Sequence, residues 1–483
     1  MSMLAGRESL GQAVAARRGL ILRIALIAAL ALAEVLIGTF APRGRQFQIP
    51  LIMLAVSAAV FGLALVYRVG RFEFGILTVP LSAGLLNFIT FPTGTQSRIV
   101  MSLIVSLALM AVWALQSVAR TRQQQWPATP IKKPILAFVA VSIISFGWTT
   151  VLRDPLVIVP PKFAFVQTAA LVVNITLPLL ALLVASKIHE INWLQWLNWM
   201  VIGLGVLAAI SFLFNLPTAA LISNGARGVF PAWVGALVCA QALFNEKLPR
   251  WGRLLLLAFL AALIYYYFIR IPDWFSGWLP LGVAVGVIMF RRSKKLFLLT
   301  LALGLGFLAF HPEVITQNVL ARAQNKGDFE RLDLWRMNLE LVAQHPLLGV
   351  GPAGYAVYNV TYHPADARST HNNYFDVLAQ TGVIGLAVFL FLFGVFGWVG
   401  VSNCLALSHQ RGFEEAFAVA TLAGCAAALA AMMLGDWVLP FAYNQTISAF
   451  DNAAFTWLFL GCAVSLRQIL AARRPVITAS MAA

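Results

Sequence analysis

Charged residues are scarce in this chain. Only 11% of its 483 residues are Asp, Glu, Lys or Arg, and 60% are hydrophobic. Soluble domains carry about 25% charged residues. So little charge cannot cover the surface of a water-soluble protein of this length, which excludes a soluble globule and predicts a membrane protein.

Cysteine and acidic residues are also few. The four cysteines (Cys239, Cys404, Cys425 and Cys462) fall in or beside apolar runs, so we expect apolar packing and neither a disulfide framework nor a metal site. The 18 acidic residues are outnumbered by 34 Lys and Arg, giving a net charge of +16. Because the basic residues are dispersed over many loops, they indicate membrane topology and anionic lipids, not a nucleic-acid partner.

Long apolar runs occupy most of the chain. Stretches of roughly 17 to 25 apolar residues can cross the hydrocarbon core as helices, and about fourteen are present, with twelve as the lower bound. The sequence predicts an all-α fold, a polytopic transmembrane helical bundle in which residues 1–483 form one integral membrane domain. The runs lie at residues 20–41, 49–67, 72–91, 98–119, 134–152, 163–186, 194–214, 228–245, 252–269, 275–290, 295–310, 378–401, 416–434 and 451–468.

The positions of lysine and arginine predict the orientation of the bundle. With a cytoplasmic N-terminus, 22 of the 34 positive residues fall on the inner side, as expected for cytoplasmic loops. Residues 470–483 are then a flexible cytoplasmic tail. A 67-residue interval, residues 311–377, faces the exterior or periplasm. This interval contains most of the chain's polar groups outside the apolar runs, so we expect the functional site there.

The exterior interval predicts a surface helix at residues 328–344. Asp328 can cap its start, and Pro346 disfavours helical geometry just before it. The helix carries one apolar stripe, formed by Leu332, Trp335, Leu339 and Val342.

Two arginines flank this stripe. Arg331 and Arg336 are about 140° apart around the helix. On a helix lying on the membrane with its stripe down, either guanidinium would stand at the level of lipid phosphates. They can bind a phosphate group of a substrate, or they can simply extend to headgroups.

A glycine-rich segment follows the surface helix. Gly349, Gly351 and Gly354 match the pattern GxGxxG, but no alternation of strands and helices surrounds them, so a dinucleotide site is rejected. Glycine and proline at this density predict a tight turn.

His371 stands just before the apolar run at residues 378–401. Thr370 is placed to cap the helix there, with Asn372 beside it. The positive end of a helix dipole keeps a histidine neutral and able to accept a proton, as a general base requires. The alternative is an ordinary capping or interfacial histidine.

The stretches ERLDLWRMNLELVAQHPLLGVGPAGY, residues 330–355, and THNNYFDVLAQTGVIGL, residues 370–386, resemble the signature of the O-antigen ligase and O-antigen polymerase superfamily. In that family an arginine and a tryptophan precede a glycine-rich turn, and a His-Asn pair opens the next transmembrane helix. The resemblance implies an inverting glycosyltransferase of the bacterial inner membrane that needs no metal or cofactor. Its donor would be a glycan on undecaprenyl diphosphate, used at the periplasmic face.

The resemblance also implies roles for particular residues. Arg331 and His371 occupy the family positions for diphosphate binding and for the base that activates the acceptor. Arg227 matches an arginine at the start of a span, although it can also be an ordinary helix-end residue. Arginine offers a permanently charged fork of donors for a diphosphate leaving group, and the base must reach the attacking oxygen.

The chain departs from the family at one point. Where a Ser-Arg-Gly-like step is common, it has Ser276-Gly277 without an arginine, and Arg270 can take that place or pair with Asp273 at the surface. Asp436 and Asn372 are candidates for orienting His371 or binding an acceptor hydroxyl. Helix capping or loop solvation is the alternative for Asp436.

Several functions remain open from the sequence. The acceptor of a ligase would be lipid A-core, whereas a polymerase would use a second glycan chain. A transporter of lipid-linked sugars should carry ionisable residues near the bilayer midplane, and a scaffold protein needs no site. The gathering of polar residues in one exterior loop favours the transferase, with membrane lipids as its surroundings.

Overall fold

The computed structural model describes residues 72–92, 98–119, 129–216, 219, 227–271, 275–310, 328–363, 369–442 and 447–480. The chain divides into two compact units, Met1–Arg68 and Val69–Ala483, and all described residues belong to the second. The first two predicted spans, residues 20–41 and 49–67, lie outside the described residues.

Helices make up nearly all of the described chain, which confirms the all-α polytopic fold. A small antiparallel hairpin, β1 (Thr90–Pro92) and β2 (Arg98–Val100), is the β structure found among the described residues. The helices are α3 (Phe72–Leu85), α4 (Met101–Ala119), α5 (Lys132–Val151), α6 (Phe163–Lys187), α7 (Ile191–Leu213), α9 (Phe230–Phe244), α10 (Arg250–Ile264) with the π-helical η1 (Tyr265–Arg270), α11 (Phe275–Arg292), α12 (Lys294–Phe310), α15 (Asp328–Gln344), α16 (Gly354–Tyr362), α17 (Asn373–Ala406), α18 (Phe413–Met432), the short 3-10 turn η4 (Ile447–Ala449) and α19 (Phe450–Ser480).

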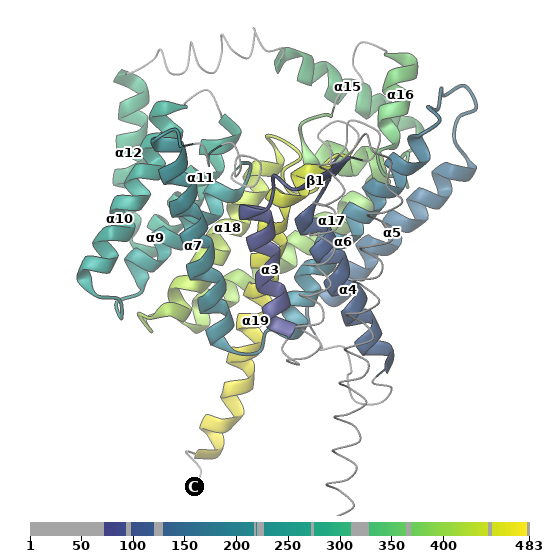
Figure 1. Cartoon of the computed structure of the whole chain (residues 1–483). Coiled ribbons are helices and arrows are strands. Elements are labelled where there is room, and N and C mark those ends of the chain that lie inside the picture. The colour runs from purple at the N-terminus through teal and green to yellow at the C-terminus, as the bar shows by residue number, and fades with distance from the viewer. Residues whose placement is uncertain are drawn as a thin grey trace, which may run out of the picture. The chain divides into compact units, whose positions relative to one another are not determined.

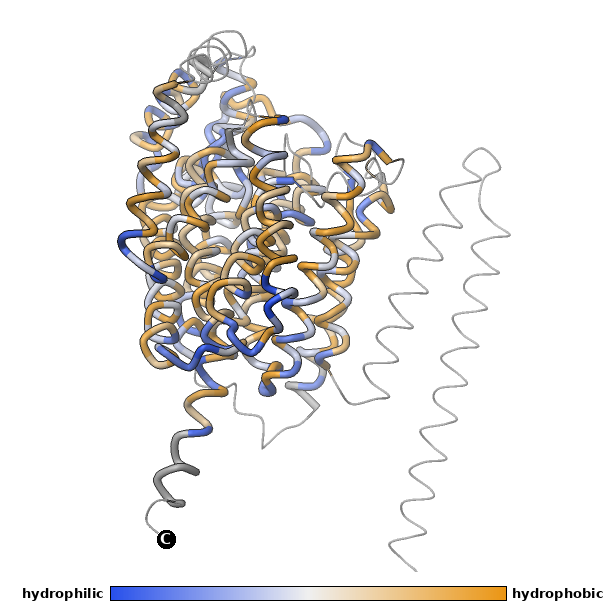
Figure 2. The backbone as a smooth tube through the Cα atoms, turned by 90° about the vertical axis from the view of Figure 1, so that its left-hand side faces the viewer, coloured by the Kyte–Doolittle hydropathy of each residue, from blue (hydrophilic) through white to orange (hydrophobic). Residues whose placement is uncertain are grey.

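Length and composition allow many of these helices to cross a bilayer. In the described part of the chain, seven are long and apolar enough: α5, α6, α7, α10 with η1, α17, α18 and α19 with η4. The outer helices expose large apolar side chains such as Leu254 (66%) and Leu303 (66%), which suits contact with hydrocarbon. Figure 2 shows hydrophobic residues along the helices and hydrophilic ones mainly in the loops that join them.

The centre of the bundle is formed by α6, α18 and α19. In the most apolar stretch of each of these helices, 67%, 78% and 83% of the residues are buried, compared with 17% for the peripheral α10. Small residues allow this close packing. A Cβ added to Gly424 of α18 would meet the ring of Trp233 on α9, and one added to Gly461 of α19 would meet the Ala181 carbonyl oxygen of α6, 2.6 Å away.

The helices α15 and α16 lie at one end of the bundle, together with the starts of α17 and α19, and α19 ends at the other end (Figure 1). We call these the loop end and the tail end. The described segments of the interval that the sequence places outside, residues 328–363 and 369–377, lie at the loop end. Since α19 continues to Ser480, most of the predicted tail at residues 470–483 is helical, and its flexibility stays a prediction.

The predicted surface helix is confirmed with the same bounds, Asp328–Gln344. The face of α15 that packs on the protein is buried through Leu334, Asn338 and Leu341. Asn338 tolerates burial because its side-chain amide donates to the Leu334 carbonyl (2.8 Å). Of the predicted stripe, Leu332 (56%) and Leu339 (47%) are exposed, whereas Trp335 packs on Phe375, so contact of the stripe with a membrane surface stays a prediction.

Candidate functional site

The glycine-rich segment is bound to a break in α17. The helix is interrupted at Gly382, whose φ and ψ are 68° and −171°. The break leaves carbonyls of the preceding turn without helical partners. Ala379 and Gln380 instead accept hydrogen bonds from the backbone N–H groups of Val350 and Gly351, both at 2.9 Å. The turn and the helix therefore complete each other's backbone hydrogen bonding.

Glycine is required on both sides of this contact. Gly349 has a φ of 62°, and a Cβ there would stand 2.4 Å from the carbonyl oxygen of Ala379. A Cβ on Gly382 would stand 2.2 Å from the carbonyl oxygen of Leu347. The predicted tight turn is confirmed, and the glycines serve close packing of backbone on backbone.

Trp335 anchors α15 to the segment that precedes α17. Its indole N–H donates to the Thr370 carbonyl (2.9 Å), and its ring stacks on Phe375 with centroids 5.0 Å apart and planes at 14°. Arg331 lies one turn earlier on α15, on the same side of the helix. The structure describes the backbone position of Arg331, and its side chain lies outside the described part.

His371 occupies an unusual backbone conformation between two buried residues. Its φ is 52°, a left-handed value that few non-glycine residues adopt. Its N–H donates to the Ser369 hydroxyl (3.0 Å), and its side chain is half-buried while Thr370 and Asn372 are buried. Such strain persists only where surrounding contacts impose it.

The cap of α17 differs from the prediction. Asn372, and not Thr370, is the N-cap, because its side-chain oxygen accepts from the Tyr374 N–H (3.0 Å). The left-handed turn at His371 moves the start of the helix past Thr370. The Thr370 hydroxyl is then used elsewhere, in a contact with Asp376.

Asp376 and Tyr355 form a buried network that the sequence reasoning missed. Asp376 Oδ1 accepts from the Tyr355 hydroxyl (2.5 Å) and from the Thr370 hydroxyl (2.6 Å). Its Oδ2 is buried without a hydrogen-bond partner among the described residues. The signal in the sequence was an acid in the first turn of a helix, which is ordinarily a group that stabilises the dipole.

Asp436 lies in the same neighbourhood. It is 1% exposed, and one carboxylate oxygen accepts from the Phe441 N–H (2.9 Å). The Tyr355 ring stacks on Phe441, with centroids 4.3 Å apart. Burial, followed by the charges of Asp376 and Asp436, raises the pKa of Tyr355 well above its usual value. Both carboxyl groups therefore act on the same tyrosine.

The loop that carries Asp436 is tied to the His-Asn-Asn segment. Asn373 donates to the Leu439 carbonyl (2.7 Å) and accepts from the Val438 N–H (3.0 Å). Asn372 donates to the Met433 carbonyl (3.4 Å). These contacts clamp residues 433–439 against the start of α17, on the C-terminal side of His371.

Arg227 stands at the edge of this loop. The next residue, Gly228, has a φ of 59°, and a Cβ there would meet the Trp437 ring at 2.5 Å. Arg227 itself is exposed and begins the turn that leads into α9. The structure thus brings three predicted residues, Arg227, His371 and Asp436, to adjoining segments at the loop end.

Two other predicted residues, Arg270 and Arg336, have no contact in the described chain that joins them to these segments. Arg270 is exposed at the end of η1. Arg336 forms an i,i+4 ion pair with Glu340 (3.3 Å), with side chains 81% and 60% exposed. Among the described residues no hydrogen bond or ion pair connects either arginine with His371, so their part in the site stays a prediction.

Groups that could bind a metal ion do not cluster in the described ranges. In the described ranges no cluster of three or more His, Cys, Asp or Glu has the arrangement of a metal site. All four cysteines are buried and unbonded, which confirms their predicted packing role.

Asp436→Asn is expected to stabilise the protein near pH 7.5 by about 2 to 3 kcal/mol. Burial raises the pKa of Asp436 to about 6, against about 3.9 in an unfolded chain. The folded protein holds the extra proton between these values, so stability falls as the pH rises through that window and stays lower above it. Asparagine imitates the protonated acid and keeps an acceptor for Phe441.

Thermal unfolding in detergent at pH 4 and pH 7.5 checks this prediction. The variant should gain at pH 7.5 and match the wild type at pH 4. An equal change at both pH values would contradict an ionisation effect.

Comparison with known proteins found a family match. Residues 212–390 match the O-antigen ligase family model, a range that includes Arg227, α15, the glycine turn and His371 but ends before Asp436. The search of curated proteins returned no match. The family match confirms the resemblance drawn from the sequence: residues 212–390 of this polytopic membrane protein are similar to the O-antigen ligase family.

Proposed function

We propose that this protein is an O-antigen ligase that transfers a glycan from undecaprenyl diphosphate to a sugar hydroxyl of lipid A-core. The reaction takes place at the periplasmic face of the bacterial inner membrane, where the loop end lies. The observation that carries the proposal is the meeting of the Arg227, His371 and Asp436 segments, joined by Asn373 and by the contact of Gly228 with Trp437.

His371 is the proposed base. It removes the proton from the acceptor hydroxyl as that oxygen bonds to the anomeric carbon of the donor. The bond from this carbon to the diphosphate breaks, and the configuration at the carbon inverts. The contacts on Thr370 and Asn372 hold the histidine in place, which suits a base that must reach one oxygen within hydrogen-bond distance.

Arg227 and Arg331 are the proposed binders of the donor diphosphate. The leaving group gathers negative charge in the transition state, and a guanidinium stabilises it with fixed charge and paired donors. Arg227 is exposed at the loop end beside α9, whose first turn contains no acidic residue. With arginines for the diphosphate and a histidine for the proton, the proposed reaction proceeds without metal.

Asp376, Asp436 and Asn372 are proposed to support this chemistry. Asp376 fixes Thr370 directly, and Asn372 fixes the start of α17. Asp436 lies beyond Tyr355 and Phe441, where it orients the loop that borders the acceptor position.

Transfer by the purified protein in nanodiscs tests the function. The donor is a glycan on undecaprenyl diphosphate, and the acceptor is either lipid A-core or a second molecule of the donor. Product with lipid A-core identifies a ligase, and product only with the second donor identifies a polymerase that uses the same site. Absence of product with both acceptors would contradict the proposal.

Arg227→Gln is expected to weaken donor use about 10-fold or more, since a hydrogen bond to a charged group contributes about 1.5 to 3 kcal/mol. The change should appear in the KM for the donor. The matched control is Arg98→Gln, another exposed arginine near the loop end, on β2. Equal effects of the two variants would contradict the assignment of Arg227 to the donor site.

A further inference from the structure

An apolar groove lies near the tail end, away from the proposed catalytic site. It encloses about 370 Å³ between α11, α12, α17 and α18, with Val287, Phe290, Phe297, Val401 and Leu422 among its lining residues. Phe290 is 50% and Val401 47% exposed, so the groove opens sideways on the outer surface of the bundle. In a membrane such an opening faces the acyl chains of lipids.

Arg291 stands among the lining residues of this groove. Its Nε is buried and has no hydrogen-bond partner among the described residues. One terminal nitrogen reaches the Cys404 carbonyl at 3.5 Å, the outer limit of a hydrogen bond. A buried guanidinium nitrogen without a partner costs free energy, so the described protein satisfies the guanidinium of Arg291 poorly.

The charges around Arg291 are not balanced by acidic residues. Residues 291–295 read RRSKK, and α12 begins at Lys294 with no acid in its first turn, where the helix dipole is already positive. Lys294 and Lys295 are exposed, and neither forms an ion pair with an acid of the described chain.

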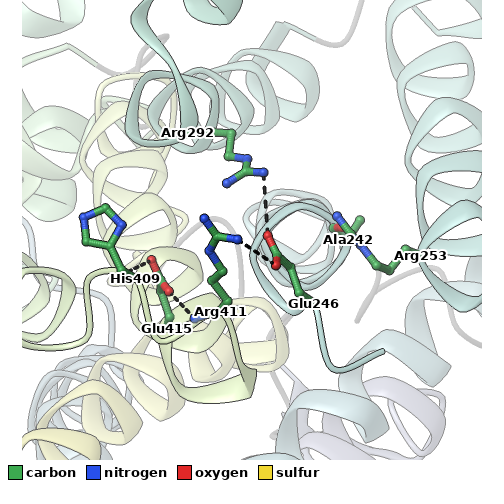
Figure 3. A network of polar contacts seen from close by, with 7 residues as sticks. All are labelled: Ala242, Glu246, Arg253, Arg292, His409, Arg411 and Glu415. Carbon is green, nitrogen blue, oxygen red and sulfur yellow. Dashed lines mark hydrogen bonds and ion pairs between the residues drawn. The ribbon is translucent and has the colours of Figure 1, made fainter. Parts of the chain in front are cut away.

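Nearby acids are already engaged, as Figure 3 shows. Glu246 pairs with Arg292 (3.9 Å) and Arg411 (3.2 Å). Glu415 accepts from the backbone N–H groups of His409 (3.2 Å) and Arg411 (2.7 Å). Glu246 is thus shared by two arginines, and these two acids do not balance the positive charges of Arg291, Arg292, Arg411, Lys294 and Lys295.

We propose that this groove is a binding site for an anionic phospholipid of the bilayer leaflet at the tail end. One acyl chain lies along the apolar lining, and the phosphate contacts Arg291, Lys294 and Lys295. A basic pocket between transmembrane helices has the chemistry that anionic headgroups require. A zwitterionic lipid fills the apolar groove without balancing the charge, and free phosphate balances the charge without filling the groove.

Lipid binding to the purified full-length protein tests the headgroup part. Phosphatidylglycerol is titrated into protein in phosphatidylcholine nanodiscs, and retained lipid is counted by native mass spectrometry. Lys294→Gln with Lys295→Gln is expected to lower phosphatidylglycerol affinity about tenfold, at roughly 1 kcal/mol or less for each charge. The matched control replaces Lys132 and Lys133, a pair at the start of α5.

A second pair of variants tests the groove itself. Val401→Trp fills it, whereas Leu390→Trp places the same side chain on α17 at a position of similar exposure, 44% against 47%. Only Val401→Trp should lose the retained lipid. Glycan transfer is measured in parallel. Since lipid retention is measured by mass spectrometry and does not depend on transfer, the two results test the lipid site and the proposed function separately.

Four outcomes would overturn the proposal. They are equal retention of phosphatidylcholine and phosphatidylglycerol, equal losses in the two lysine pairs, equal losses in the two tryptophan variants, and displacement of the lipid by inorganic phosphate.

Discussion

His371→Ala is expected to lower the rate of glycan transfer about 10²- to 10⁴-fold, the range for loss of a general base. The donor should still bind, because the diphosphate is assigned to the arginines and not to the imidazole. The left-handed backbone at residue 371 is a structural reason to assign the role of base to His371. Asp376 and Trp335 hold Thr370, and Asn372 caps α17, so the fold fixes this turn whichever side chain projects from it.

The measurement is kcat with saturating donor and acceptor, together with the Kd of the donor by a direct binding method. His363→Ala is the matched control, an exposed histidine just after α16. It should keep full activity. Wild-type transfer by His371→Ala would exclude the base assignment. Loss of donor binding by that variant would instead indicate that His371 binds the donor.

Local signals in the sequence predicted two elements beside this site, the helix α15 and the glycine-rich turn. Asp328 and Pro346 bracket α15 because capping and proline effects act over one or two residues. Glycine density likewise predicted the turn at residues 346–354, since only glycine accepts its backbone angles cheaply. Each of these features depends on neighbours in the chain, and each appears in the structure where it was expected.

Contacts between distant residues were beyond the same reasoning. The Tyr355 to Asp376 hydrogen bond joins residues 21 apart, and the Val438 to Asn373 bond joins residues 65 apart. No periodicity in the sequence encodes such pairs. The cap prediction failed for the same reason: Thr370 is a good capping residue by type, but a buried carboxylate from the next helical turn binds its hydroxyl.

Likewise, nothing in the sequence indicated that Gly382 interrupts a helix. It lies in an apolar run where glycine is common in membrane helices, and the sequence predicted an uninterrupted span. In the structure it breaks α17 and provides the backbone surface on which the turn after α15 lies. Pro346 then accepts from the Val383 N–H (2.8 Å), which completes the junction.

Gly382→Ala is therefore expected to destabilise the protein by about 3 kcal/mol or more. Its backbone angles, 68° and −171°, belong to a region that is almost restricted to glycine and costs about 1 to 3 kcal/mol for other residues. The added Cβ would also stand 2.2 Å from the Leu347 carbonyl oxygen, and a backbone atom on a tight turn cannot move aside. Overpacking of this kind costs about 1 to 3 kcal/mol more.

Gly394→Ala is the matched control, on the same helix and with nothing within 4 Å of the added Cβ. It should be neutral or stabilising by up to about 1 kcal/mol, because alanine is the better helix former. Thermal unfolding of both variants in detergent measures the difference, and equal midpoints would mean that the break at Gly382 is not required.

The same substitution connects stability with chemistry. α17 carries His371 and Asn372 just before its first turn, and the turn pinned at the break connects α15 with α16, which supply Trp335 and Tyr355. If Gly382→Ala still folds at low temperature, its transfer rate should fall further than its folded fraction explains. Activity in proportion to folded protein would show that the break supports the fold without positioning His371.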